Sequence, residues 1–344
     1  MKGPRIKFSL ALVAMIALIA VVLGAVVGRA STSSAGTGGS AGPAAVAGKR
    51  VDVIIKASDS SFWQTMLAGA KKAGADFGVK VSLFGPTSET DVNEQVQLME
   101  NSISRGVDAV AIASNSSDAL NDVISRARKA GIKVITVDNA VTTPTDGFIG
   151  TDNIKAGEAG GARLCDLLKK AGRTQGQILL ESSVAGVQVL KDRDSGFKKG
   201  LAAGCPDVKV GTTRYNNNDI NTAAGQVNDA ITSNRDLLGV FADNNASGVG
   251  AARAIKDNSA ADRIPVVAFD SDPQENAALA DGSIDALVVQ NPYFFGYQGV
   301  IEAAMATARN FPPVKLDPGA VVVDKSNMNQ PDVGRLLKPP TEKL

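Results

Sequence analysis

Residues 104–139 read SRGVDAVAIASNSSDALNDVISRARKAGIKVITVDN, and this stretch decides the fold. Its two apolar runs, over 109–113 and 133–137, have the length of buried strands, and residues 118–130 between them have the spacing of an amphipathic helix. Gly131 follows that helix directly, where a left-handed cap favours glycine. The stretch therefore predicts a β-α-β unit with parallel strands.

The alternation of short apolar runs and helical segments continues on both sides of this unit. It gives about ten strand–helix steps, which is too many for one compact sheet, so we predict an α/β protein with two doubly wound parallel-sheet lobes. A length of 344 residues is enough for two such domains. The further strands are expected over 51–57, 79–84, 177–181, 208–214, 238–242, 266–269, 286–289 and 321–324.

The composition argues against catalysis and against nucleic-acid binding. The chain has no histidine, which removes the commonest general base and the commonest metal ligand. Its formal net charge is +1 and its charges are scattered, which does not suit a phosphate backbone. We therefore predict no catalytic residue, no metal, no cofactor and no nucleic-acid partner.

The N-terminal 30 residues have the features of an export signal. A basic start precedes an apolar run over residues 8–27, and Gly28-Arg29-Ala30 offers a cleavage site after Ala30. The run is also long enough to cross a bilayer, so an uncleaved membrane anchor is the alternative. Residues 31–49 are rich in Ser, Gly and Ala and are expected to form a flexible linker. Either way the body lies outside the cytoplasm, in the periplasm or at the cell surface.

The two cysteines, Cys165 and Cys205, leave two interpretations open. Outside the cytoplasm an even pair favours a disulfide, which would contribute on the order of 4 kcal/mol in the chain-entropy model. Two buried free thiols on separate helices fit the sequence equally well.

Polar residues recur where the predicted strands end, at the edge where parallel sheets bind ligands. Carboxylates and amides suit the paired hydroxyls of a sugar, and the pair Phe62-Trp63 offers a flat apolar face to its ring. Each feature has a structural alternative, because Asp and Asn are favoured helix N-caps and the aromatic pair could belong to the core. The strand-end residues are Ser58-Asp59-Ser60-Ser61-Phe62-Trp63, Asp138-Asn139, Asp243-Asn244-Asn245, Asp270 and Gln290-Asn291.

Eight segments carry a resemblance to a known family. From residue 51 to about 325 the chain resembles the ribose-binding-protein-like sugar-binding proteins, the type I periplasmic solute-binding proteins of ATP-driven importers. The segments follow the family's order and span nearly the whole body, which is more specific than any single motif. They are DSSFW (59–63), SRGVDAVAIASNSSDAL (104–120), AGIKVITVDN (130–139), IGTDN (149–153), RDSGF (193–197), VFADNN (240–245), VVAFDSDP (266–273) and VVQNP (288–292).

The resemblance implies a ligand site with contributions from both lobes. Phe62 and Trp63 match the aromatic pair that stacks on the sugar ring, and Asp138 matches a carboxylate that binds its hydroxyls. Arg193, in the Arg-x-x-Gly-Phe motif, matches an arginine that reaches the sugar from the second lobe. The polar residues matched in that lobe and in the hinge are Asn244, Asp270 and Gln290.

The chain departs from the ribose-binding pattern at four positions. Ser60 replaces an asparagine, Asn139 an arginine and Ala113 another asparagine, while Asn218 replaces the aromatic residue that closes the other face of the ring. We keep Ser60, Asn139 and Asn218 among the predicted ligand-binding residues. The departures predict a pocket that lacks one stacking wall and one cation, so a pentose, a hexose, a polyol, an inositol or a furanose-like signal molecule would fit.

The resemblance also implies two lobes joined by a three-strand hinge, the type I periplasmic binding protein fold. We place the crossings near Thr151–Asp152, Gln290–Asn291 and Gly319–Ala320. The predicted divisions are a first lobe over 51–151 and 291–318, a second lobe over 152–290 and 319–335, and a loosely held tail over 336–344.

The implied function is that of an extracytoplasmic substrate-binding protein of an ABC transporter. It would close about its hinge around a small sugar or polyol, act as a monomer and deliver the ligand to a membrane permease. A ligand-sensing receptor that signals to a membrane sensor is the alternative. A nicotinamide-dependent enzyme is disfavoured, because the turn after the first strand lacks glycine, and a lac-repressor-like regulator would need an N-terminal helix-turn-helix.

Overall fold

The computed structural model describes residues 46–308 and 313–341. The predicted signal or anchor over 1–30 and most of the predicted linker therefore lie outside the described residues. The last linker residues are described, and Val46 among them is buried in the core beside the first sheet. Across the two described ranges, no helix has both the length and the apolar character needed to cross a bilayer.

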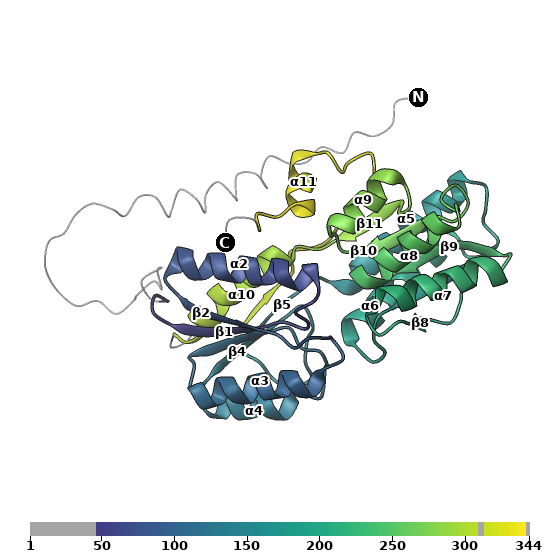
Figure 1. Cartoon of the computed structure of the whole chain (residues 1–344). Coiled ribbons are helices and arrows are strands. Elements are labelled where there is room, and N and C mark those ends of the chain that lie inside the picture. Colours follow the sequence, from purple (N-terminus) through teal and green to yellow (C-terminus); the bar gives the residue numbers. More distant parts are fainter. Residues whose placement is uncertain (1–45, 309–312, 342–344) are drawn as a thin grey trace, which may run out of the picture. The chain divides into compact units, whose positions relative to one another are not determined.

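The first sheet is parallel throughout (Figure 1). Its strands lie in the order β12 (Val314–Leu316), β5 (Gly147–Ile149), β4 (Lys133–Val137), β3 (Ala109–Ile112), β1 (Arg50–Ile54) and β2 (Lys80–Phe84). Helices α2 (Ser61–Phe77) and α10 (Pro292–Ala306) share a core with one face, and α3 (Val92–Arg105) and α4 (Asn121–Lys129) share a core with the other. Alternation along β1 explains this, because Val53 enters the first core and Ile54 the second.

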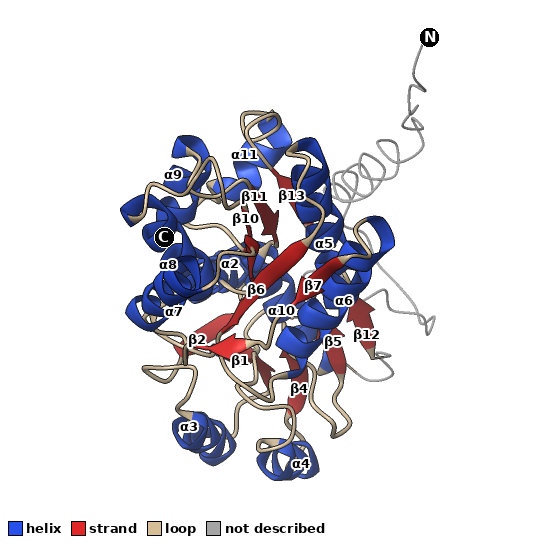
Figure 2. Cartoon of the chain, turned by 90° about the vertical axis from the view of Figure 1, so that its right-hand side faces the viewer, coloured by secondary structure: helices blue, strands red, loops and turns tan. Residues whose placement is uncertain are grey.

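The second sheet repeats this plan with one antiparallel edge. Its strands lie in the order β13 (Val321–Val323), β11 (Ala286–Val289), β10 (Val266–Phe269), β9 (Leu237–Ala242), β6 (Gly176–Ser182) and β7 (Val208–Val210), with β8 (Arg214–Tyr215) also paired to β6. Only β13 runs antiparallel to its neighbour. Helices α5 (Asn153–Lys170) and α6 (Gln188–Gly204) lie on one face, and α7 (Ile220–Ser233), α8 (Asn245–Asp257), α9 (Pro273–Asp281) and α11 (Pro331–Leu337) on the other (Figure 2).

The predicted class, two doubly wound α/β lobes, is therefore confirmed. We use "first lobe" and "second lobe" for the two sheets with their helices. The chain passes between them after β5, after β11 and between β12 and β13. The residues predicted as crossings lie in these three connections.

Helices α5 and α6 pack with their backbones in direct contact, and this fixes where α6 lies. A Cβ atom at Gly157 would collide with the carbonyl oxygen of Arg193, and one at Gly161 with that of Phe197. Only glycine allows so close an approach. The pair is further joined by a disulfide between Cys165 and Cys205, whose Cα atoms are 5.7 Å apart. Of the two interpretations of the cysteines, the structure shows the disulfide.

Three features differ from the sequence prediction. Strands β5 and β12 were not expected, because their three residues, GFI and VKL, form no continuous apolar run like the VVV of β13. The predicted strand over 208–214 is divided into β7 and β8. The predicted loosely held tail over 336–344 overlaps helix α11 (Pro331–Leu337), which buries Val333 and Leu337 against the second-lobe core.

Candidate functional site

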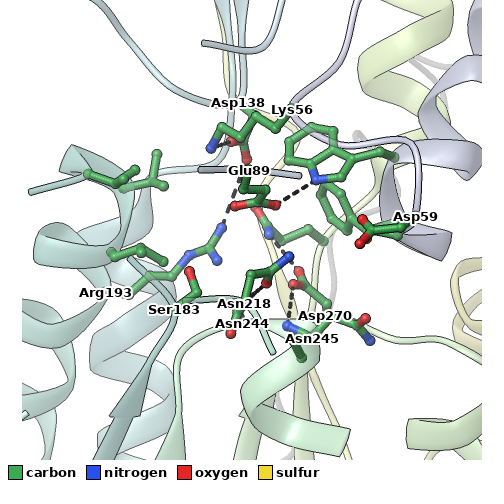
Figure 3. Close-up of a pocket in the computed structure, with 18 of the residues that line it drawn as sticks. Lys56, Asp59, Glu89, Asp138, Ser183, Arg193, Asn218, Asn244, Asn245 and Asp270 are labelled. Atoms are coloured by element: carbon green, nitrogen blue, oxygen red, sulfur yellow. Dashed lines mark hydrogen bonds and ion pairs between the residues drawn. The ribbon is translucent and has the colours of Figure 1, made fainter. Parts of the chain in front are cut away.

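The strand ends of the two lobes meet around one cavity, which holds about 670 Å³ of space including its open mouth (Figure 3). The ends of parallel strands are the usual place for a small-molecule site. Nine of the ten predicted ligand-binding residues line it. They are Ser60, Phe62, Trp63, Asp138, Arg193, Asn218, Asn244, Asp270 and Gln290.

The aromatic pair forms the apolar side of the first-lobe wall. Phe62 and Trp63 lie in the first turn of α2, with ring centroids 4.8 Å apart and planes at 78°. Both rings also belong to the buried core of the first lobe. The two interpretations of this pair, ligand contact and core residue, are thus compatible, and the core holds the rings in place for a ligand.

Asp138 lies at the centre of the charged part of the wall, directly after β4. Its Oδ2 atom accepts a hydrogen bond of 2.7 Å from Lys56 Nζ, and its Oδ1 atom lies 3.9 Å from Arg193 Nη2. All three side chains are buried. The carboxylate is therefore paired with a lysine of the first lobe and an arginine of the second, which offsets the cost of burying charge.

Arg193 projects from α6 and is held by three further contacts within the second lobe. Its Nε donates to Asn153 Oδ1 (2.8 Å) and its Nη1 to the carbonyl oxygen of Asp243 (2.9 Å), and its guanidinium lies 4.4 Å from the ring centroid of Phe269. A planar group with several donors can make such contacts together, whereas a lysine could not.

Asp270 is the second carboxylate of the site and follows β10. Gln290 Nε2 donates to its Oδ1 atom (2.7 Å), and the backbone N–H of Asn245 donates to its Oδ2 atom (3.2 Å). Burial raises the pKa of Asp270, and the nearby charge of Arg193 partly opposes this. Asp138 and Asp270 both have left-handed backbones (φ 61° and 78°), a conformation that is uncommon for residues with a side chain and recurs at functional sites.

Amides complete the second-lobe wall. Asn244 caps α8 through its Oδ1 atom, which accepts from the N–H of Ser247, and its Nδ2 donates to Asn218 Oδ1 (2.7 Å). It thus fulfils the structural interpretation, and its place in the cavity wall is compatible with the ligand-binding one. In the described part of the chain, two buried atoms of the wall have no hydrogen-bond partner, Gln290 Oε1 and Ser183 Oγ.

The tenth predicted residue, Asn139, does not line the cavity among the described residues, so this prediction was wrong. Its N–H donates to the carbonyl of Val137 (2.7 Å), so the chain makes a tight turn at Asp138. The turn sends consecutive side chains in different directions, and Asn139 Nδ2 donates to the carbonyl of Ser114 (3.1 Å).

The sequence predicts a pocket that lacks one cation and one stacking wall. Other lining residues supply a cation and an apolar surface. Lys56, just beyond β1, supplies a cation at Asp138. On the second lobe the wall opposite the aromatic pair is aliphatic, from the starts of α6 and α7. Asp59 and Asn245 belong to the predicted strand ends but not to the predicted ligand-binding set. The lining residues absent from that set are Lys56, Asp59, Glu89, Ser183, Val187, Val189, Leu190, Ile220, Asn245 and Ala246.

The described residues form no candidate metal site. Over residues 46–308 and 313–341, no three His, Cys, Asp or Glu side chains are grouped so that they could hold an ion.

Two lobes that enclose one polar cavity at their strand ends define a two-lobed solute-binding protein. Residues 51–309 match the family described as periplasmic binding protein domain, and the chain belongs to this family. The family binds substrates for ABC transporters and is not enzymatic, so the chain is a binding protein and not an enzyme.

Relatives with known ligands lie within this family. The ribose import binding protein of Salmonella typhimurium is 27% identical over 257 residues, which cover 74% of this chain and 84% of that protein. A carbohydrate transporter solute-binding protein of Agrobacterium radiobacter, solved with D-arabinose, is 32% identical, with a TM-score of 0.81 over 84% of this chain and 98% of the other. A second, from Agrobacterium vitis with bound D-fucose, is 30% identical, with a TM-score of 0.79 over 84% and 99%.

Proposed function

We propose that the chain captures a neutral monosaccharide or small polyol in this cavity, outside the cytoplasm, and delivers it to the permease of an ABC importer. One observation carries the proposal: carboxylates, amides and cations of both lobes converge on a single small cavity beside an aromatic pair. Similar proteins hold D-arabinose and D-fucose, which are neutral monosaccharides.

The unpartnered polar atoms support a ligand rich in hydroxyls. A buried polar atom without a partner costs about 1–3 kcal/mol, so native structures rarely leave one unexplained. Gln290 Oε1 can accept a hydrogen bond from a hydroxyl, and Ser183 Oγ can donate or accept one. A sugar entering the cavity would supply both partners.

The charges of the wall support a neutral ligand. Four acidic side chains line the cavity, against Lys56 and Arg193. Both cations already lie beside Asp138, so neither is free to pair with an anion. A uronate or a sugar phosphate would therefore meet uncompensated negative charge. The acids are Asp59, Glu89, Asp138 and Asp270.

The position of the cavity supports hinge closure. Asp138 belongs to the first lobe and Arg193 to the second, and their side chains lie 3.9 Å apart. A ligand that contacts both lobes stabilises the closed arrangement relative to an open one, which gives the permease two states to distinguish. The three connections between the lobes are the proposed hinge.

Export and oligomeric state belong to the same proposal. The basic and apolar N-terminal segment supports an export signal, with retention through residues 8–27 as the alternative. The Cys165–Cys205 disulfide supports an oxidising compartment. Since one chain supplies the whole cavity wall, we propose that the protein acts as a monomer.

Tryptophan fluorescence offers a direct test, because Trp63 is the only tryptophan of the chain and lines the cavity. Titration with D-arabinose, D-fucose, D-ribose, D-allose and myo-inositol should change the emission for at least one sugar. Calorimetry should give the same dissociation constant, and thermal stability should rise with occupancy. If no sugar or polyol binds at millimolar concentration, the proposal is wrong.

A further inference from the structure

Glu89 brings a carboxylate into the cavity from a loop outside the strand ends. The loop joins β2 to α3, and Figure 3 shows the Glu89 carboxylate among the residues of the cavity wall. The loop has hydrogen bonds of its own: the N–H of Ser88 donates to Asp91 Oδ2 (3.2 Å), and the N–H of Asp91 donates to the carbonyl of Ser88 (3.1 Å). These bonds fix the backbone on both sides of Glu89.

One oxygen of Glu89 is used and the other is free. Trp63 Nε1 donates to Oε1 over 2.7 Å, which fixes the indole relative to the carboxylate. Among the residues the structure describes, Oε2 has no hydrogen-bond partner. Burial raises the pKa of Glu89, and the charge of Lys56 and the indole N–H oppose this.

Within the described ranges, no cation is paired with Glu89. Lys56 lies over the Trp63 ring, with Nζ 5.3 Å from the centroid, and donates its hydrogen bond of 2.7 Å to Asp138 instead. The carboxylate therefore faces the cavity with one acceptor atom unused. A hydroxyl donor on the ligand can fill that position.

We propose that Glu89 is a specificity-determining residue, whose free oxygen accepts a hydrogen bond from one ligand hydroxyl at the Trp63 edge of the cavity. The inference rests on the proposed function and refines it. A ligand that lacks this hydroxyl, or carries it in the opposite configuration, leaves the carboxylate desolvated and unpaired. Sites built to hydrogen-bond a hydroxyl reject analogues without it far more strongly than apolar pockets reject a missing methylene.

The test compares Kd values from calorimetry for wild-type protein and Glu89→Gln, using the best-bound sugar and its monodeoxy analogues. The wild-type protein should bind one analogue, the one without the contacted hydroxyl, at least tenfold more weakly than the parent sugar. In Glu89→Gln the parent sugar should bind about 10–100-fold more weakly, and its advantage over that analogue should shrink to a few fold.

Two further variants separate recognition from a structural effect. Glu94→Gln removes an exposed carboxylate five residues away that does not line the cavity. The amide oxygen can still accept from the N–H of Thr87 (3.4 Å), so every Kd should stay within about twofold of wild type. Trp63→Phe removes the indole N–H but keeps a ring and Glu89. It should weaken all the sugars while the preference for the contacted hydroxyl persists.

The inference would be overturned if Glu89→Gln weakened the parent sugar and all its deoxy analogues by the same factor. The same conclusion would follow if Trp63→Phe abolished the preference as Glu89→Gln does, because Glu89 would then act only through the indole. Failure of the wild-type protein to bind any sugar would overturn the proposed function as well, whereas sugar binding with an unchanged preference in Glu89→Gln would overturn this inference alone.

Discussion

Glu181 should make the stability of the second lobe depend on pH near neutrality. It lies in β6 and is 0% exposed. Its Oε1 atom accepts from Asn216 Nδ2 (3.1 Å), and its Oε2 atom has no partner within the described residues. Burial raises the pKa of Glu181 from 4.5 to about 8, because the hydrogen bond and the charge of Arg214 compensate only in part.

The raised pKa sets both the sign and the size of the effect. Between about pH 4.5 and pH 8 the folded protein keeps a proton on Glu181 that the unfolded chain has released. The stability is therefore complete below the unfolded pKa and falls as pH rises, by about 1.4 kcal/mol per pH unit, until the folded pKa is reached. The full loss over this window is about 5 kcal/mol.

The substitution Glu181→Gln isolates this contribution, since an amide stays neutral and can still accept from Asn216. Urea unfolding of both proteins should be measured between pH 5.5 and pH 7.5. The free energy of unfolding of the variant, minus that of wild type, should rise by about 3 kcal/mol across that range. The absolute difference in unfolding free energy between variant and wild type depends on how well the amide packs at this position. The change of that difference with pH does not.

Asp219→Asn provides the control in the same lobe. Asp219 caps α7 by accepting from the N–H of Thr222 (2.6 Å), and this bond lowers the pKa of Asp219. Asp219 titrates below the chosen pH range. The difference in unfolding free energy between Asp219→Asn and wild type should therefore stay constant with pH. Parallel wild-type and Glu181→Gln curves would refute the reasoning, since Glu181 would then ionise within the folded protein as it does in water.

Three further outcomes are expected. Arg193→Lys should lower sugar affinity at least 100-fold in calorimetry despite the retained charge, because a lysine cannot make the arginine's contacts; a Kd within threefold of wild type would contradict this. Gly161→Ala should lower the free energy of unfolding by about 2–4 kcal/mol and weaken binding as well, because the new methyl group meets the Phe197 carbonyl and displaces α6; an unchanged urea midpoint would count against it. Replacing Cys165 and Cys205 together by alanine should cost about 4 kcal/mol of unfolding free energy, a loss that reducing agent should reproduce in wild type but not in the variant.

Much of the fold could be predicted from the sequence because the main signals are local. Apolar runs of four to seven residues alternate with helical periods along most of the chain, and a parallel sheet follows from that alternation. The elements that escaped prediction are the ones whose stability is not local. Strands β5 and β12 have three residues each and persist because neighbouring strands pair with them. Helix α11 has seven residues and is held by the core that it covers.

The predicted site depends on a geometric rule, and its gaps lie where that rule does not apply. Residues that directly follow parallel strands reach one edge, so Asp138, Asp270 and Gln290 could be placed together from the sequence. The rule cannot tell which of two adjacent residues faces the cavity, and Asn139 turns away for that reason. Glu89 comes from a loop whose course depends on tertiary contacts, so no pattern pointed to it.

Lys56 is a lining residue whose burial beside a carboxylate could have been predicted from the sequence. A lysine at the end of the apolar run VDVII is a charge about to be buried, and a buried charge needs a partner. Asp138 follows the strand two places along the sheet and provides that partner. A pairing argument of this kind predicts a contact between strand ends without any knowledge of the ligand.

Arg193 connects the packing of the second lobe with the chemistry of the site. Its backbone belongs to α6, which the glycine contacts and the disulfide fix against α5, so the guanidinium starts from a defined position. From there Asn153 and the carbonyl of Asp243 orient it, and its free edge points toward Asp138 of the other lobe. Little side-chain entropy remains to be lost when a ligand binds, which favours affinity. The close helix packing is therefore part of the binding site, even though no glycine touches the cavity.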